Sequence, residues 1–260
     1  MQYEPDIAFL TETSLTKHDD NSVFLCRKDY EVFRRDRIMT DDNCSGHVGG
    51  GVAVLCKRAF HPCVLGQVDD VEGLWIELTK PKKILVGCFY RPHVSLVDQM
   101  HRMIDSFKHK LSNYEEVVIC GDFNLPGIDW SDLTASTSLD QNIFLSEFLV
   151  NGLKQHILFP TFPRSGNTLD LVFSSTSSLT ENPRPHDDVT VSDHTPVFFY
   201  ISLPDNMSDS VRNESVLDFK NMDRGLTRFF RRTRRAAVAV LAKDTPPGSR
   251  CSPPSPEGEG

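Results

Sequence analysis

The sequence predicts an α/β domain of two mixed β-sheets that pack against each other and carry helices on their outer faces. Apolar strand-like runs outnumber helical segments, several runs follow one another with only turns between them, and two helical segments interrupt the series. This mixture favours packed sheets with outer helices over a doubly wound parallel sheet, in which strands and helices alternate.

The strands are predicted from short runs rich in β-branched and aromatic residues. In chain order these runs are Ile7–Leu10, Val52–Leu55, Leu74–Leu78, Ile84–Tyr90, Val117–Cys120, Leu169–Phe173 and Val197–Leu203. Gly49, Gly50 and Gly51 precede the second run and therefore indicate a flexible turn, because a phosphate-binding loop would follow a strand.

Two helices are predicted between the strands. The first begins near Ser95 and Asp98, a pair typical of a capping box, and its apolar residues are spaced 3, 4, 3 and 4 apart, so they share one helical face. These residues are Val97, Met100, Ile104, Phe107 and Leu111. The second helix runs from about Leu139 to Asn151, and Gly152 is the residue expected to end it.

Composition divides the 260 residues into three parts. Residues 1–203 are predicted to form the domain, and residues 204–230 a linker that could contain a helix. Residues 231–260 are basic and then rich in Pro, Gly and Ser, so we expect a disordered tail with too little apolar surface to offset the entropy of ordering. The run Arg231–Arg235 is compatible with a nuclear-targeting or nucleic-acid-binding patch, and equally with a solvated charge run.

The charge of the chain limits its partners. The formal net charge is −8 for the whole chain, and −10 over residues 1–203 from 18 basic and 28 acidic side chains. Such a body repels a polyanion unless local basic patches or metal ions offset the charge. This charge therefore disfavours a large surface that binds nucleic-acid phosphates without regard to base sequence.

The sequence also indicates a cellular compartment. No apolar run reaches 18 residues, and the N-terminus lacks the basic and apolar regions of a signal peptide. The seven cysteines are scattered without a C-x-x-C pair, which fits a reducing environment. We therefore expect a protein of the nucleus or cytoplasm that does not span a membrane and is not secreted.

The most informative motif lies at the end of the predicted strand Val117–Cys120. Gly121-Asp122-Phe123-Asn124 follows that strand, and Pro126-Gly127 then turns the chain away. Strand ends of α/β sheets hold reactive groups on a rigid backbone. Asp122 can take a proton or hold a cation, and Asn124 can both donate and accept hydrogen bonds. This pair suits chemistry on a phosphate.

Four further segments place polar residues in or beside predicted strands. They are Pro5–Glu12, Cys88–Pro92, Asn167–Phe173 and Ser192–Pro196, and they contain Glu12, Tyr90, Asp170, and Asp193 with His194, respectively. Each has an ordinary structural explanation when taken singly: Glu12 as a turn residue, Tyr90 as a packing residue, and Arg91 as a surface cation. Asp170 lies inside an apolar strand, where an unpaired carboxylate is costly. Their joint occurrence in one order indicates a common site.

In this order the segments resemble the endonuclease/exonuclease/phosphatase family, whose members include apurinic endonucleases, DNase I-like nucleases and inositol phosphatases. The likeness is greatest to the endonuclease domain of non-LTR (LINE-type) retrotransposons. Its markers are Leu125–Trp130 after the Gly121–Asn124 motif, Tyr90-Arg91-Pro92, and the stretch Pro160–Asp170. Inositol phosphatases differ near the Asp170 position. The resemblance implies a DNase I-like four-layer sandwich over about Pro5–Leu203.

The resemblance also implies a metal-dependent mechanism. Glu12 would bind Mg²⁺, with Asp193 as a further ligand and Mn²⁺ as an alternative ion; oxygen ligands suit such hard cations. His194, oriented by Asp170, would either contact the scissile phosphate or help to activate water. These two roles stay open at this point.

The remaining catalytic roles follow from the same resemblance. Asp122 would be the proton-handling carboxylate, Asn124 would fix substrate or water, and Tyr90 would donate to a phosphoryl oxygen. The implied activity is nicking of double-stranded DNA, where the nick primes reverse transcription of an element RNA by a reverse transcriptase domain.

The sequence departs from the family pattern at its start. Family members begin with a strand that carries an Asn and with a helix, and this strand and helix are absent before Pro5–Glu12. We therefore expect an exposed inner strand edge. The rivals to a nuclease are a truncated remnant of the domain without turnover, and a cellular phosphatase or a repair nuclease that prefers abasic DNA.

Overall fold

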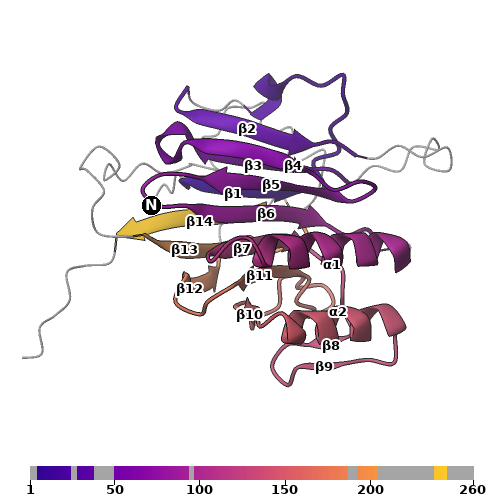
Figure 1. Cartoon of the computed structure of the whole chain (residues 1–260). Coiled ribbons are helices and arrows are strands. Elements are labelled where there is room, and N and C mark those ends of the chain that lie inside the picture. Colours follow the sequence, from indigo (N-terminus) through magenta and orange to yellow (C-terminus); the bar gives the residue numbers. More distant parts are fainter. Residues whose placement is uncertain are drawn as a thin grey trace, which may run out of the picture.

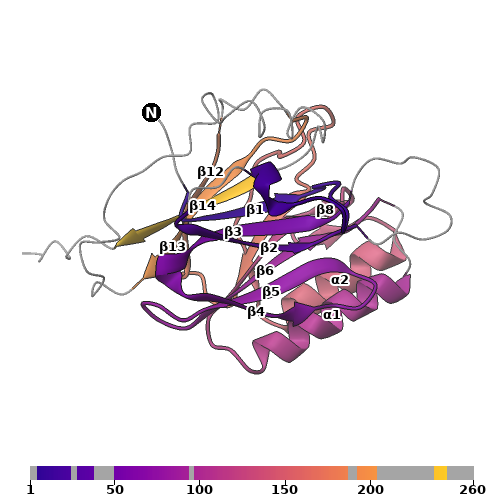
Figure 2. The same ribbon diagram turned by 90° about the horizontal axis from the view of Figure 1, so that it is seen from above.

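Two six-stranded β-sheets pack face to face in the computed structural model, and two helices cover the outer face of one of them (Figure 1). The structure describes residues 5–24, 28–37, 50–93, 97–186 and 192–203, and the backbone of 237–244. Figure 2 shows the layers edge-on, with the helices on one side and the short segment that contains η1 (Asn21–Phe24) on the other. The predicted sandwich of mixed sheets is confirmed.

The first sheet, called sheet A, has the order β12-β13-β14-β1-β3-β2. Its strands are β1 Ile7–Thr11, β2 Tyr30–Arg35, β3 Val52–Lys57, β12 Thr180–Pro185, β13 Val197–Leu203 and β14 Ala237–Asp244. All neighbours are antiparallel except β13 and β14, which are parallel.

The second sheet, called sheet B, has the order β10-β11-β7-β6-β5-β4. Its strands are β4 Pro62–Gln67, β5 Glu72–Leu78, β6 Ile84–Tyr90, β7 Val117–Asp122, β10 Lys154–Gln155 and β11 Asp170–Ser174. Its one parallel pair, β6 and β7, is joined by helix α1 (Val97–Leu111), since parallel neighbours need a crossover. Between β7 and β10 lie the hairpin β8 (Ile128–Asp129) and β9 (Thr134–Ala135), and helix α2 (Leu139–Val150).

Both predicted helices are present. The face of α1 predicted from its spacing is buried through Met100, Ile104 and Phe107, whereas Ser95 of the expected capping box lies outside the described residues. Helix α2 ends as expected at Gly152, whose backbone adopts φ +66 and whose N–H bonds to the carbonyl of Leu149. No helix among the described residues is long and apolar enough to cross a membrane.

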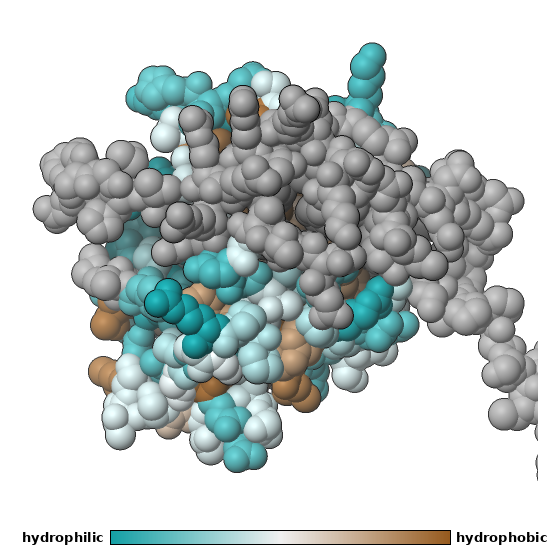
Figure 3. Space-filling model, turned by 180° about the vertical axis from the view of Figure 1, so that it is seen from behind, coloured by the Kyte–Doolittle hydropathy of each residue, from teal (hydrophilic) through white to brown (hydrophobic). Residues whose placement is uncertain are grey.

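The side chains of the two sheets form three apolar layers. Alternate residues of β1, β3, β6, β7 and β13 fill the space between the sheets, and the opposite face of sheet B packs under α1 and α2 through Trp75, Phe89, Phe123 and Phe173. A smaller cluster with Leu15 and Phe24 covers the outer face of sheet A. On the face of Figure 3, apolar side chains of the described part lie scattered among polar ones.

The strands that the sequence failed to predict are mainly the edges of the sheets. β2, β4, β10 and β12 form the four edges, and most of their residues are exposed or half-buried. Polar side chains on edge strands prevent edge-to-edge pairing, but they also remove the apolar run from which a strand is recognised.

Strand β14 corrects two expectations. Residues Ala237–Asp244, placed by the sequence in a disordered tail, pair with β13 in parallel, Val197 opposite Val238, and with β1 in antiparallel, Leu10 opposite Ala237. The disordered tail is thus wrong for these eight residues, whose apolar composition suits a central strand. The edge of β1 expected to be exposed is paired with β14. The predicted linker 204–230, the run Arg231–Arg235 and residues 245–260 lie outside the described residues.

Candidate active site

Three adjacent strands of sheet B bring three of the predicted residues into one row. Asp122, the last residue of β7, lies opposite Tyr90 on β6 and opposite Asp170 on β11. All three side chains are buried, at 7% exposure for Tyr90 and 1% for each aspartate. Because β6 and β7 run parallel, their carboxyl ends meet at the same edge of the sheet, and the row forms there.

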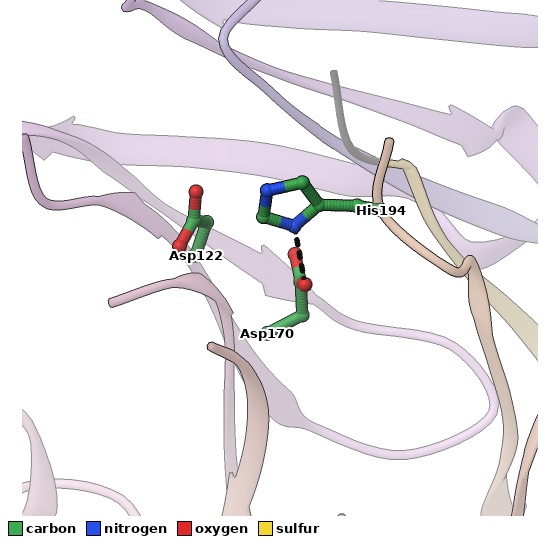
Figure 4. Close-up of side chains that lie close together, drawn as sticks. All are labelled: Asp122, Asp170 and His194. Carbon is green, nitrogen blue, oxygen red and sulfur yellow. Dashed lines mark hydrogen bonds and ion pairs between the residues drawn. The ribbon is translucent and has the colours of Figure 1, made fainter. Parts of the chain in front are cut away.

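His194 joins this row from the segment that precedes β13. Its Nδ1 lies 2.7 Å from Oδ2 of Asp170, and Figure 4 shows its second ring nitrogen turned towards Asp122. A carboxylate only accepts hydrogen bonds, so Nδ1–H donates and Nε2 is left for another group. Ligand atoms of Asp122, Asp170 and His194 all lie within 4.8 Å of one another.

Glu12 enters the site from sheet A. It follows the last residue of β1, has a positive φ of 53°, and is 2% exposed. The hydroxyl of Tyr90 donates a hydrogen bond to its carboxylate. Glu72 lies opposite Tyr90 in the register of β5 and β6, and it accepts the N–H of Gly51 at 2.6 Å. The rim of the site therefore contains several carboxyl groups from both sheets.

Asn124 and Arg91 hold each other in place beside Asp122. Nδ2 of Asn124 donates to the carbonyl of Arg91 at 2.8 Å, and Nη1 of Arg91 donates to the carbonyl of Asn124 at 3.0 Å. Arg91 also pairs with Asp140 of α2 at 2.5 Å and is only 6% exposed. The interpretation of Arg91 as a surface cation is wrong: its guanidinium fixes the turn after β7.

The electrostatics follow from this crowding of acids. Burial, then the charges of Asp170 and Glu12, raise the pKa of Asp122 well above its usual range, although His194 opposes the shift. Burial alone would lower the pKa of His194, but Asp170, with Asp122 and Asp193, raises it to about 9. Burial and the neighbouring acids raise the pKa of Tyr90, which keeps its phenol protonated.

Asp193 lies apart from the buried row. It is exposed, whereas its neighbour His194 is 7% exposed, and it acts on His194 as a nearby negative charge. The structure thus brings together Glu12, Tyr90, Asp122, Asp170 and His194, with Asn124 at the flank. It places Asp193 at the surface beside them.

Thr161, which has no role predicted from the sequence, joins two arms of the site. Its Oγ1 accepts the N–H groups of Leu169 and Asp170, each at 2.9 Å, and its carbonyl accepts the N–H of Thr195 at 2.7 Å. Thr161 is fully buried. It lies in the Pro160–Asp170 stretch that carries the family resemblance, but the sequence does not predict its hydrogen bonds.

The donor set fits a divalent cation. Glu12, Asp122 and Asp170 place three buried carboxyl groups close together with one imidazole, and Oδ1 of Asp170 is buried without a hydrogen-bond partner among the described residues. Oxygen donors with excess negative charge are the ligands that Mg²⁺ and Mn²⁺ prefer. Since Nδ1 of His194 and Oδ2 of Asp170 are used by each other, carboxylate oxygens are the better ligands here.

Comparison with known proteins gives a match to a family model. The endonuclease-reverse transcriptase family model matches residues 84–198, which contain the whole buried row except Glu12. No curated protein matches the chain in sequence.

Solved structures with the same fold include three with a TM-score above 0.5. The endonuclease domain of TRAS1, a telomere-specific non-LTR retrotransposon, is 16% identical, with a TM-score of 0.53, 73% of this chain and 82% of that chain covered. The 3′ phosphatase NExo from Neisseria, bound to a product DNA hairpin, is 15% identical, with a TM-score of 0.54 and coverage of 74% and 86%. The 3′–5′ exonuclease NExo from Neisseria meningitidis is 15% identical, with a TM-score of 0.54 and coverage of 74% and 87%. The chain is thus similar in sequence to the endonuclease-reverse transcriptase family over residues 84–198, and it shares the fold of these structures over most of its length.

Proposed function

We propose that this chain hydrolyses phosphodiester bonds in double-stranded DNA with the help of Mg²⁺, as the endonuclease part of a non-LTR retrotransposon. The observation that carries the proposal is the Asp170–His194 pair, which faces Asp122 at the edge where Tyr90 and Glu12 also meet. Phosphodiester hydrolysis needs hydrogen-bond donors for the phosphoryl oxygens and a base for the attacking water. This row supplies both.

His194 contacts the scissile phosphate in this mechanism. Asp170 accepts its Nδ1–H and thereby fixes the ring, so Nε2 is the nitrogen that reaches a phosphoryl oxygen. The acids around the ring favour its charged form, and a charged donor stabilises the negative charge that develops in the transition state. Of the two roles left open by the sequence, the geometry favours contact with the phosphate.

Asp122 takes the proton of the attacking water, and Tyr90 turns its hydroxyl from Glu12 to a second phosphoryl oxygen when the substrate binds. The two side chains lie on neighbouring strands in one register pair, so their spacing is fixed by the sheet. The Nδ2 of Asn124 is used by Arg91, which leaves its side-chain oxygen to orient water or substrate. Glu12 would hold Mg²⁺ or Mn²⁺ with the unpartnered Oδ1 of Asp170, and Asp193 would be a further ligand from the adjoining surface. The bound ion would supply a positive charge for the phosphate and lower the pKa of a bound water.

The retrotransposon assignment rests on the endonuclease-reverse transcriptase family match and on the fold shared with the TRAS1 domain. In such an element the nick leaves a 3′ hydroxyl that primes reverse transcription of the element RNA by a reverse transcriptase domain. The substrate would be chromosomal DNA, so we propose action in the nucleus.

Plasmid nicking tests the proposal. The purified full chain should convert supercoiled plasmid to the open circle with Mg²⁺ and not with EDTA. Asp122→Asn and His194→Ala should each slow the reaction by about 10²–10⁴-fold, the usual cost of a lost general acid or base. Asp132→Asn, a neutralised acid at an exposed position beyond β8, should keep full activity. Wild-type rates for Asp122→Asn would contradict the assignment, and no nicking by any variant would favour the remnant without turnover.

A second substrate class is suggested by the shared fold with NExo, a 3′ phosphatase. Duplexes that carry a 3′ phosphate or an abasic site, and an inositol phosphate, should be offered beside the plasmid. Faster turnover of one of these substrates than of intact duplex would replace the retrotransposon assignment with a phosphatase or a repair nuclease.

A further inference from the structure

We infer that three arginines at the end of β2 and just beyond it form a second anion site beside the candidate active site, where a phosphate of the DNA strand binds a few nucleotides from the scissile bond. This inference rests on the proposed function. The site is the arginine hollow, lined by Arg34, Arg35, Asp36, Arg37 and Gln67, with a volume of about 440 Å³. Three arginines and one aspartate line it, on a domain whose overall charge is strongly negative.

The frame of the arginine hollow is fixed by contacts within the fold. Nη2 of Arg34 donates to the carbonyls of Thr16 and Asp19, at 3.2 and 2.5 Å, and its Nε lies 3.0 Å from Oδ1 of Asp36. Nη1 of Arg35 donates to the side chain of Gln67 on β4. The guanidinium planes are thus held before any ligand arrives, which lowers the entropic cost of binding.

Donors remain for a ligand after these contacts. Nη1 of Arg34 and Nε of Arg35 are buried and have no hydrogen-bond partner among the described residues. A guanidinium has five N–H donors in a planar fork that matches two oxygens of a phosphate. Because leaving buried donors unpaired costs free energy, an anion bound in the hollow satisfies both the charge and the hydrogen bonds.

The arginine hollow lies at the same end of sheet A as Glu12. Arg35 pairs with Val52 of β3, and Val52 pairs with Thr11 of β1, the residue before Glu12. Two strand spacings of about 4.8 Å separate Arg35 from Thr11, roughly 10 Å in all. At this separation one strand of DNA can reach both sites, with the second phosphate a few nucleotides from the cut.

Gly50 and Gly51 complete the connection between the two sites. A Cβ on Gly50 would lie 2.7 Å from Oε2 of Glu72 and 3.2 Å from Cγ of Arg37, and a Cβ on Gly51 would lie 2.7 Å from Oγ1 of Thr13. Arg37 and Glu72 therefore meet across a bare backbone, and Glu72 is the register partner of Tyr90. The absence of a Cβ at these two glycines leaves room for the side chains of Glu72, Arg37 and Thr13 to pack on the backbone between the two sites.

DNA binding at several salt concentrations tests the inference. The chain with His194→Ala, which should not cut, is titrated with a labelled duplex in fluorescence anisotropy. Adding Arg35→Gln or Arg37→Gln should weaken binding about three- to tenfold at low salt and reduce the slope of log affinity against log salt by about 1, the loss of one phosphate contact. Arg35→Lys, which keeps the charge, should retain most of the slope.

Two controls separate the arginine hollow from general charge and from stability. Arg58→Gln removes the same charge at the other end of β3, where Arg58 pairs with Glu31, and should leave the slope unchanged. Gln67→Ala removes the contact of Arg35 without removing charge and should also keep the slope. Equal slopes for Arg35→Gln, Arg37→Gln and the parent, or an equal loss with Arg58→Gln, would overturn the inference. If the His194→Ala chain binds no duplex and the wild type cuts none, the proposed function fails. If the wild type nicks plasmid but the arginine variants keep the salt slope of the His194→Ala chain, only the anion site is ruled out.

Discussion

Sheet B and sheet A contribute to the candidate active site in different ways. Sheet B supplies Tyr90, Asp122 and Asp170 from three neighbouring strands, so their spacing is set by hydrogen bonds between those strands. Sheet A supplies Glu12 after β1 and His194 before β13, and these two strands touch only through β14. One half of the site is thus fixed within residues 84–198, and the other depends on a strand from the far end of the sequence.

The largest expected effect on stability is at Gly121, in the half of the site that sheet B supplies. Gly121 has φ +146, and a Cβ there would lie 1.8 Å from the carbonyl oxygen of Phe89 on the parallel strand β6. Gly121→Ala must push β6 and β7 apart, so we expect a loss of more than about 4 kcal/mol in the free energy of unfolding. Urea denaturation followed by circular dichroism measures this loss.

Gly152 is the matched control for Gly121. It also has a positive φ, +66, but no atom lies within 4 Å of the place of its Cβ. Gly152→Ala should cost only the backbone strain, about 1–2 kcal/mol. If Gly121→Ala unfolded at the same urea concentration as Gly152→Ala, the tight β6–β7 contact would not be what holds Tyr90 against Asp122.

The next prediction concerns the half of the site that sheet A supplies. A substitution in β14 tests whether this strand is needed to position Glu12 and His194. Val240→Pro removes one backbone N–H from a strand that lies between β13 and β1, and proline is rarely tolerated in a central strand. We expect a loss of about 1–3 kcal/mol from the unpaired buried group, together with slower nicking, because β14 sets the distance between Glu12 and His194. Thermal unfolding and plasmid nicking measure the two effects.

Val240→Ile keeps the backbone N–H and is the control for the proline variant. Its stability should stay within about 1.5 kcal/mol of the wild type, as for other conservative apolar exchanges. Should Val240→Pro melt with the wild type, β14 would contribute nothing to sheet A, and Glu12 and His194 would be positioned by sheet packing alone.

The contrast between the two sheets explains which strands the sequence predicts and which it does not. The buried strands of sheet B appear as uninterrupted apolar runs, and Asp122 and Asp170 appear as acids at their ends or inside them, so the strands and the acids they carry were predictable there. β14 is also apolar, but it lies between an arginine run and a Pro-rich end, and nothing local tells that it pairs with β1. Strand pairing over such a distance depends on which edges are left open, which no local pattern encodes.

The backbone contacts that position the site were missed for a related reason. Arg91 and Asn124 hold each other by carbonyl contacts, and Thr161 receives two N–H groups through one hydroxyl. Such roles can be recognised only when the positions of main-chain atoms are known, whereas the chemistry of an acid or an imidazole follows from its residue type. The titratable groups of the site were therefore predictable, but the residues that position them were not.

The smallest expected effect is at Thr161, which joins the two halves of the site. Thr161→Val has nearly the same shape but leaves the N–H groups of Leu169 and Asp170 without their acceptor, at an expected cost of about 1–3 kcal/mol in stability. Thr161→Ser keeps the hydroxyl and should recover most of that loss. If Thr161 positions Asp170 for His194, nicking by Thr161→Val should fall in kcat with KM unchanged, and Thr161→Ser should restore it. A fall in stability without any change in kcat would mean that Thr161 only stabilises the fold. Among the contacts described between β11 and the segment before β13, the Asp170–His194 hydrogen bond would then be the one that affects catalysis.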